Sequence, residues 1–113
     1  MSEQIQHEPP QSAFQALADP TRQAILNLLA QERLHVDELA TRFPISRPAI
    51  SKHLRLLKEA GLVLEVREGR RNYYGVNLQR LRELELWLAE QRRLWNSSLG
   101  RMKRALEKDD GRA

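Results

Sequence analysis

The chain has 113 residues, of which 41% are hydrophobic and 30% are charged, and its formal net charge at pH 7 is +4. This length predicts one domain with a modest core, which association with a second copy would help to stabilise. No apolar run approaches the roughly 20 residues of a membrane span, and the absence of cysteine excludes disulfides, thiolate metal sites and thiol redox sensing. The first residues carry acids and no hydrophobic stretch, so we expect no secretory signal and a cytoplasmic protein with an anionic partner.

The first third of the chain predicts a flexible arm followed by two helices. Residues 1–11 are polar, include two prolines and show no periodicity, which is typical of an arm. A short helix over residues 12–18 would place three apolar side chains on one face: Phe14, Leu17 and Ala18. Asp19 and Pro20 form a helix start, and the helix is expected to reach about Gln31. Its buried residues are expected to be Ile25, Leu28 and Leu29.

Two further helices are predicted on either side of a tight turn. The third opens at residues 35–38, points Leu39 and Ala40 inward and ends near Phe43 and Pro44. The turn over residues 43–45 leads to Ser46, a good N-cap for a fourth helix that has Pro48 in its first turn. Gly61 is expected to terminate this helix in the C′ position.

The fourth helix has one apolar stripe and one polar face. Its apolar residues Ile50, Leu54 and Leu57 recur at i, i+4 and i+7, which predicts burial of that stripe. The outer face consists of hydrogen-bond donors and cations: Ser46, Arg47, Ser51, Lys52, His53 and Arg55. A helix of this kind suits the major groove of DNA. The segment from Arg42 to Arg80 also holds nine of the 19 cations but three of the 15 acids, so the positive charge gathers around this helix.

The periodicity changes after Gly61 and again after Asn77. Residues 62–67 and 72–77 alternate and are rich in β-formers, so they predict a hairpin whose loop, residues 68–71, is basic. One long helix is then expected from Leu78 to about Lys108, with a flexible tail over residues 109–113. Its apolar residues form two stripes, and a helix that is apolar on more than one face has more than one partner. We therefore predict a mainly α fold with a small β-hairpin, a winged helix-turn-helix with a long C-terminal dimerisation helix, over residues 12–108.

Several runs of the sequence resemble the ArsR/SmtB family of bacterial repressors. They are residues 14–22 (FQALADPTR), 38–40 (ELA), 47–54 (RPAISKHL) and 59–63 (EAGLV). The resemblance spans about residues 12–95 and implies a homodimer joined through its first and last helices. It also implies binding to a palindromic operator in double-stranded DNA near a promoter, with recognition helices in successive major grooves about 34 Å apart. Repression near its own promoter is the function that we expect from this family.

Roles for individual residues follow from this expectation. Arg47 and Lys52 can reach guanine O6 and N7, while serine and histidine can bond base edges or phosphates. The residues expected at DNA are Ser46, Arg47, Pro48, Ala49, Ser51, Lys52, His53, Arg55, Arg67, Arg70, Arg71 and Tyr74. For Ser46, a pure capping role is the alternative, and for Arg70 and Arg71 it is the protection of a sheet edge. The residues expected in the dimer interface are Phe14, Leu17, Leu84, Leu88, Trp95, Leu99 and Met102.

The family often senses metals, but the ligand positions here are altered. Where thiolate sensors carry Cys-x-Cys, this chain has His35 and Asp37, and two ligands do not fill a tetrahedral zinc shell. The long helix has no histidine, so the second metal site of the family would consist of glutamates alone. We therefore expect no metal and no cofactor. A small organic molecule, a protein partner or autoregulation would then control the protein, and a metal-responsive repressor with an unusual site is the alternative.

Two other function classes compete with a DNA-binding regulator. An enzyme is not expected, because the chain has scattered histidines, no glycine-rich phosphate loop and no paired carboxylates in an apolar setting. A winged helix can also serve as a protein-interaction module without DNA. The combination of a cationic helix face and a basic hairpin loop argues for DNA instead.

Overall fold

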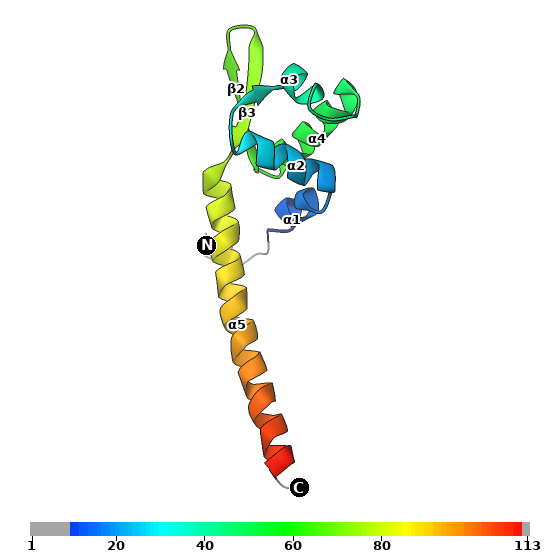
Figure 1. The fold of residues 1–113 in the computed structure, drawn as a ribbon. Helices are drawn as coiled ribbons and strands as arrows, with labels where there is room; N and C mark the ends of the chain where they lie inside the picture. Colours follow the sequence, from blue (N-terminus) through cyan, green and yellow to red (C-terminus); the bar gives the residue numbers. More distant parts are fainter. Residues whose placement is uncertain (1–9, 112–113) are drawn as a thin grey trace. The chain divides into compact units, whose positions relative to one another are not determined.

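The computed structural model describes residues 10–111, with side chains to residue 108, and the chain divides into two units at Leu81 and Arg82. The elements in chain order are α1 (Gln11–Leu17), α2 (Pro20–Leu29), β1 (Leu34–His35), α3 (Val36–Ala40), α4 (Arg47–Glu59), β2 (Val63–Glu68), β3 (Arg71–Val76) and α5 (Leu78–Gly111) (Figure 1). The predicted fold class is confirmed, since the chain is mainly helical with one small antiparallel sheet and a long last helix.

The two ends of the chain lie partly outside the described residues. Of the arm expected over residues 1–11, residues 1–9 are outside this range, and α1 already includes Gln11. At the other end α5 continues past Lys108, where we expected it to stop, and reaches Gly111. Residues 112 and 113 of the expected tail are outside the described range.

Polar side chains start two of the helices as the sequence predicts. Asp19 Oδ2 accepts a hydrogen bond from the backbone N–H of Arg22 at 2.9 Å, and Pro20 follows at the first helical position. Ser46 Oγ accepts from the backbone N–H of Ala49 at 3.2 Å at the start of α4. Each cap satisfies a backbone donor that the helix itself leaves unpaired.

Three short helices differ from the prediction in length or in buried face. In α1, Ala13 and Ala16 are buried while Phe14 and Leu17 are only half-buried, because small residues let α1 approach α2 and α4 closely. The second helix, α2, ends at Leu29 and buries Leu26, leaving Leu28 half-buried. The third, α3, ends at Ala40, well before Pro44.

The early end of α3 has a local cause. The hydroxyl of Thr41 donates to the carbonyl of Glu38 at 2.7 Å, and the backbone N–H of Thr41 bonds the same carbonyl at 3.2 Å. A threonine side chain that bonds a nearby carbonyl competes with the helical pattern. The chain then leaves the helix through turns that lead to Ser46.

The apolar stripe of α4 lies at the centre of the first unit. Ile50, Leu54 and Leu57 are essentially inaccessible to solvent, as predicted. They share the core with side chains from the surrounding elements: Ile25, Leu34, Leu39, Leu62 and Val63. Burial of each such side chain contributes about 1.5–3 kcal/mol, so this stripe fixes which face of α4 is left for solvent.

The sheet has three strands, in the order β1-β3-β2, and all pairs are antiparallel. The hairpin of β2 and β3 projects from the cluster of short helices (Figure 1). Its turn contains Gly69 with a φ of +63°, a conformation that residues with a Cβ rarely adopt. Gly61, which ends α4, likewise has a φ of +79°, in agreement with its predicted C′ role. The short strand β1 was not predicted from the sequence.

Candidate nucleic-acid interface

The outer face of α4 carries most of the side chains that the sequence predicts for DNA contact. Since Ile50, Leu54 and Leu57 face the core, the opposite side of the helix is open to solvent. The exposed residues there are Ser46, Arg47, Pro48, Ser51, Lys52 and Arg55, whereas Ala49 is half-buried. This face presents hydroxyl donors and cations on a rigid element, which is the arrangement that suits a groove lined by acceptors and phosphates.

The structure places His53 differently from its predicted neighbours. Its side chain is 19% exposed and its Nδ1 lies 3.4 Å from Nη1 of Arg22 and 3.9 Å from Oδ2 of Asp19. Arg22 in turn donates to the carbonyl of Ala16 at 2.7 Å. His53 therefore lies between α4 and the start of α2, where its contacts link helices.

The charges around Asp19 favour its ionised form. The hydrogen bond from the backbone N–H of Arg22 lowers the pKa of Asp19, and the charges of Arg22 and His53 act in the same direction against partial burial. An ionised carboxylate at this position also suits the positive end of α2. The contacts of His53 with Asp19 and Arg22 therefore help to hold α4 in its orientation against α2.

Arg47, the first residue of α4, forms an ion pair with α3. Its Nε donates to Oδ1 of Asp37 at 2.6 Å, and the two side chains are 60% and 59% exposed. That hydrogen bond is the main reason that the pKa of Asp37 is lowered, with smaller effects from the charges of Arg47, His35 and Arg71. The sequence placed Arg47 at DNA but gave no sign of its partner.

The end of the hairpin, which we call the wing tip, carries three exposed arginines: Arg67 in β2, Arg70 in the turn and Arg71 at the start of β3. The turn is limited to residues 69–70, because Glu68 and Arg71 of the expected loop pair as strand residues. Arg71 Nη1 lies 2.6 Å from Nε2 of His35. The Nδ1 atom of the same ring accepts a hydrogen bond from the backbone N–H of Glu38 at 3.4 Å, and Nε2 also lies 3.4 Å from Oε1 of Glu38. The wing tip is therefore tied to the first turn of α3, where the ring of His35 is almost fully buried and packs edge-on against Tyr73.

Tyr74 takes part in hydrogen bonds that connect the hairpin to α4, away from the wing tip. Its hydroxyl donates to Oε2 of Glu65 at 3.0 Å, and Lys58 of α4 donates to the other oxygen at 2.5 Å. Burial, together with the hydrogen bond and the charge of Glu65, raises the pKa of Tyr74 to about 12. The hydrogen bond from Lys58 is the main reason that the pKa of Glu65 is lowered. This network fixes the hairpin to α4, and contact of Tyr74 with DNA stays a prediction.

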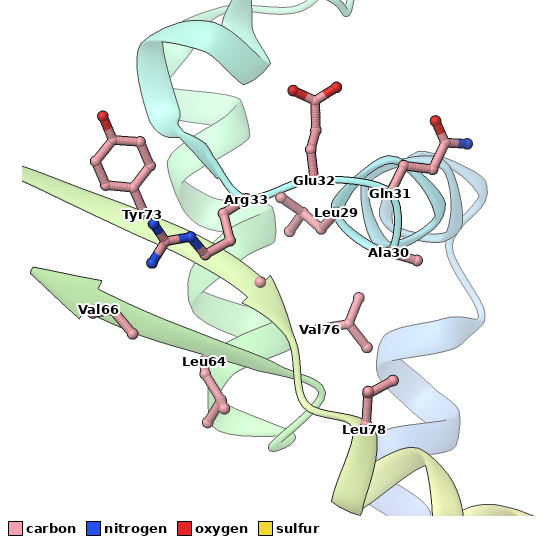
Figure 2. A pocket seen from close by; sticks show the side chains of 11 residues that line it. Leu29, Ala30, Gln31, Glu32, Arg33, Leu64, Val66, Tyr73, Val76 and Leu78 are labelled. Carbon is pink, nitrogen blue, oxygen red and sulfur yellow. The ribbon is translucent and has the colours of Figure 1, made fainter. Parts of the chain in front are cut away.

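The opposite face of the hairpin borders a groove of about 350 Å³. Leu64 and Val66 pair with Gly75 and Tyr73 across the two strands, and these residues line the groove with the C-terminal end of α2 and the start of α5. Figure 2 shows Leu64 and Val66 on the strand and Leu29, Val76 and Leu78 across from them. Arg33 lies at its border, over the ring of Tyr73, and forms an ion pair with Glu68. Strand alternation places this groove on the face away from Glu65 and Tyr74.

The second unit, α5 from Arg82 onward, exposes a row of large apolar side chains. Leu88, Trp95, Leu99 and Met102 are between 45% and 60% exposed, whereas Leu84 is buried. Further exposed apolar residues on the same helix are Leu86, Leu94 and Leu106. Assignment of Phe14, Leu17 and these α5 residues to a dimer interface stays a prediction.

No helix among the described residues is both long enough and apolar enough to cross a membrane. Within the same part of the chain, no three side chains of the types that bind metal ions lie close enough together to hold one. His35 and Asp37, the two positions at which a metal site was the alternative, contact Arg71 and Arg47.

Comparisons with known proteins agree with this arrangement. Residues 19–64 match the family model described as bacterial regulatory protein, arsR family. The HTH-type transcriptional regulator Rv2034 of Mycobacterium tuberculosis is 52% identical over 65 residues, which are 58% of this chain and 61% of that protein. The chain thus spans less than two thirds of this relative. The transcriptional repressor SdpR of Bacillus subtilis is 38% identical over 77 residues, 68% of this chain and 86% of the repressor.

Two solved structures extend the similarity to the fold. An ArsR-like transcriptional regulator from Rhodococcus sp. RHA1 has a TM-score of 0.78 and 34% identity, over 92% of this chain and 95% of that one. A homodimeric winged helix-turn-helix DNA-binding domain from Mycobacterium bovis, a possible ArsR-family regulator, has a TM-score of 0.61 and 34% identity. That comparison covers 72% of this chain and 76% of the other.

Proposed function

The chain belongs to the ArsR family of bacterial regulatory proteins, and on this premise we propose that it is a homodimeric repressor that binds a palindromic operator near its own promoter. The observation that carries the proposal is the outer face of α4. Arg47, Ser51 and Lys52 are exposed there above a fully buried apolar stripe, on the element that a winged helix-turn-helix places in the major groove. The wing tip adds exposed cations for flanking phosphates.

The apolar residues of α5 support the homodimer. A single chain leaves Trp95, Leu99 and Met102 more than half exposed, and contiguous exposed apolar surface of this kind marks an interaction site. A relative of the same fold is a homodimer. A two-fold symmetric protein presents its two recognition helices to two equivalent half-sites, so its operator should be palindromic.

The surroundings of His35 and Asp37 support a repressor that does not sense metals. Both side chains are engaged by guanidinium groups, and a metal ion at this position would have to displace Arg71 and Arg47 and then lie beside two positive charges. The chain offers no thiolate to compensate. DNA binding would then be controlled by a small organic molecule, a protein partner or the protein's own concentration. We place this function in the cytoplasm.

Fluorescence anisotropy with labelled duplex DNA tests the proposed function. DNA from upstream of the protein's own gene should bind more tightly than a scrambled duplex of the same composition. The logarithm of the binding constant should fall linearly with that of the salt concentration, by about 0.9 for each phosphate contacted. Equal affinity for the two duplexes at all salt concentrations would contradict sequence-specific repression.

Isothermal titration calorimetry tests metal independence separately. Zinc, nickel and copper are titrated into the protein alone and into its complex with upstream DNA. We expect no stoichiometric tight binding and no release of DNA. A metal that binds tightly and releases the duplex would show that the protein is a metal sensor with an unusual ligand set.

A further inference from the structure

The ion pair between Asp37 and Arg47 lies at the outer face of α4, which is the proposed DNA-binding face. Its contribution to the stability of the fold is small, because both side chains are about 60% exposed and solvent screens the attraction between exposed charges. Arg47 is the first residue of α4 and belongs to the face assigned to the major groove. The ion pair therefore affects the orientation in which the Arg47 side chain would approach DNA.

The atoms used in the pair leave the base-reading end of Arg47 available. Asp37 Oδ1 accepts from Nε, and the structure gives Nη1 and Nη2 of Arg47 no other side-chain partner among the described residues. Guanine presents two acceptors, O6 and N7, in the major groove, and a guanidinium satisfies both with two N–H groups. A guanidinium held at Nε keeps its two terminal nitrogens for such a contact.

Asp37 lies on a turn that is itself held in place. The carboxylate of Glu38 accepts from the backbone N–H of His35 at 3.1 Å, which closes the start of α3. The next residue, Val36, begins the helix, so Asp37 lies in the first turn, where the helix favours a negative charge. The side chain of His35 is anchored by Arg71 of the wing tip. Asp37 thus offers a fixed acceptor between two DNA-facing elements.

We propose that Asp37 is a specificity-determining residue that orients Arg47 toward a guanine of the operator. The carboxylate holds the guanidinium plane by Nε and opposes its rotation toward a phosphate, so that Arg47 contributes sequence preference as well as charge. The inference rests on the proposed function, since it assigns a role within the same DNA-reading face. Asp37 acts through Arg47 and makes no contact with DNA of its own.

The experiment compares base discrimination among variants. The wild-type protein first selects its preferred sequence from duplexes with a randomised centre, and Arg47→Ala identifies the guanine whose preference depends on Arg47. Anisotropy then gives the affinities of wild type, Asp37→Asn, Arg47→Ala and the double variant for the preferred duplex and for one with that base pair replaced. The wild type should discriminate between them about tenfold or more. Asp37→Asn should lose most of this ratio, Asp37→Glu should retain part of it, and Asp37→Asn should add nothing to Arg47→Ala.

Glu59→Gln is the matched control. Glu59 also pairs with an arginine of α4, Arg55, at 4.0 Å, and the substitution removes one negative charge in the same way. It should change the affinity for both duplexes by the same factor and leave their ratio intact. Circular dichroism and thermal unfolding of each variant confirm that the fold is retained.

Three results would overturn the inference. Asp37→Asn could keep the full discrimination of the wild type, or it could tighten binding to both duplexes equally, as expected of an acid that merely repels phosphate. Arg47→Ala could also leave every guanine preference unchanged. A wild-type protein that enriches no sequence at all contradicts the proposed function instead, so the two failures are distinguishable.

Discussion

Ser46 shows how one residue can serve both the fold and the interface. Its hydroxyl caps α4 through the backbone N–H of Ala49, yet the residue is exposed at the end of α4 that faces DNA in the proposed complex. The two roles respond differently to substitution, because capping needs a short side-chain acceptor whereas an approach to phosphate tolerates no added negative charge.

Two substitutions at Ser46 separate these roles. Ser46→Ala should lower the free energy of unfolding by about 1 kcal/mol, because the cap is lost. Ser46→Asp should retain the cap and the stability but weaken DNA binding by charge repulsion. Urea denaturation and anisotropy titration measure the two quantities. Unchanged DNA affinity in Ser46→Asp would mean that the start of α4 does not approach the phosphate backbone.

His53 marks the limit of what helical periodicity can predict for single residues. It follows the buried Ile50 by three positions and directly precedes the buried Leu54, so it belongs to the margin of the stripe. The residue type of His53 suggested a contact in the DNA groove. In the structure, the position of its ring is determined by Arg22 and Asp19, which lie at the start of α2. Those neighbours come from another helix, and spacing along α4 contains no information about them.

At the level of elements, the hairpin is held to α4 by a small network of titrating groups. Tyr74 and Lys58 both donate to the carboxylate of Glu65. The pKa of Tyr74 is raised to about 12 in the folded protein, above the value of about 10 for an unfolded chain. The folded state thus keeps a proton that the unfolded state loses, so folding is progressively disfavoured as the pH rises between these two values.

Tyr74→Phe tests this linkage. The free energy of unfolding of the wild type should fall more steeply between about pH 10 and pH 12 than that of the variant, which has no proton to retain there. Urea denaturation at a series of alkaline pH values gives both curves. Parallel curves over this window would show that Tyr74 titrates normally and is not held by Glu65.

The helices and the hairpin could be predicted from the sequence because their signals are local. Asp19, Ser46 and Gly61 mark helix ends, and the stripe of α4 follows from spacing alone. Strand β1 was missed because two residues carry no alternation, and Leu34 and His35 become a strand only by pairing with Tyr74 and Tyr73. The partners of Arg47 and Arg71 were missed for the same reason, since α3 meets them only through the tertiary fold.

For the whole molecule, the apolar surface of α5 is the feature that a single chain leaves unexplained. Its row of leucines, with Trp95 and Met102, is predicted to be covered by a second copy. Leu99→Asp should therefore yield monomers in light scattering and lose operator binding, because one DNA-binding head covers only half a site. Ser98→Asp, at the neighbouring exposed polar position, is the matched control and should remain dimeric. A wild-type monomer would contradict the dimer.

The central claim is that two copies of α4 read a symmetric operator, and hydroxyl-radical footprinting of DNA upstream of the gene tests it most directly. The protein should protect two patches on one side of the duplex, separated by about one helical turn of roughly 34 Å and related by a two-fold sequence symmetry. A single protected patch, or uniform protection without a preferred sequence, would contradict the account.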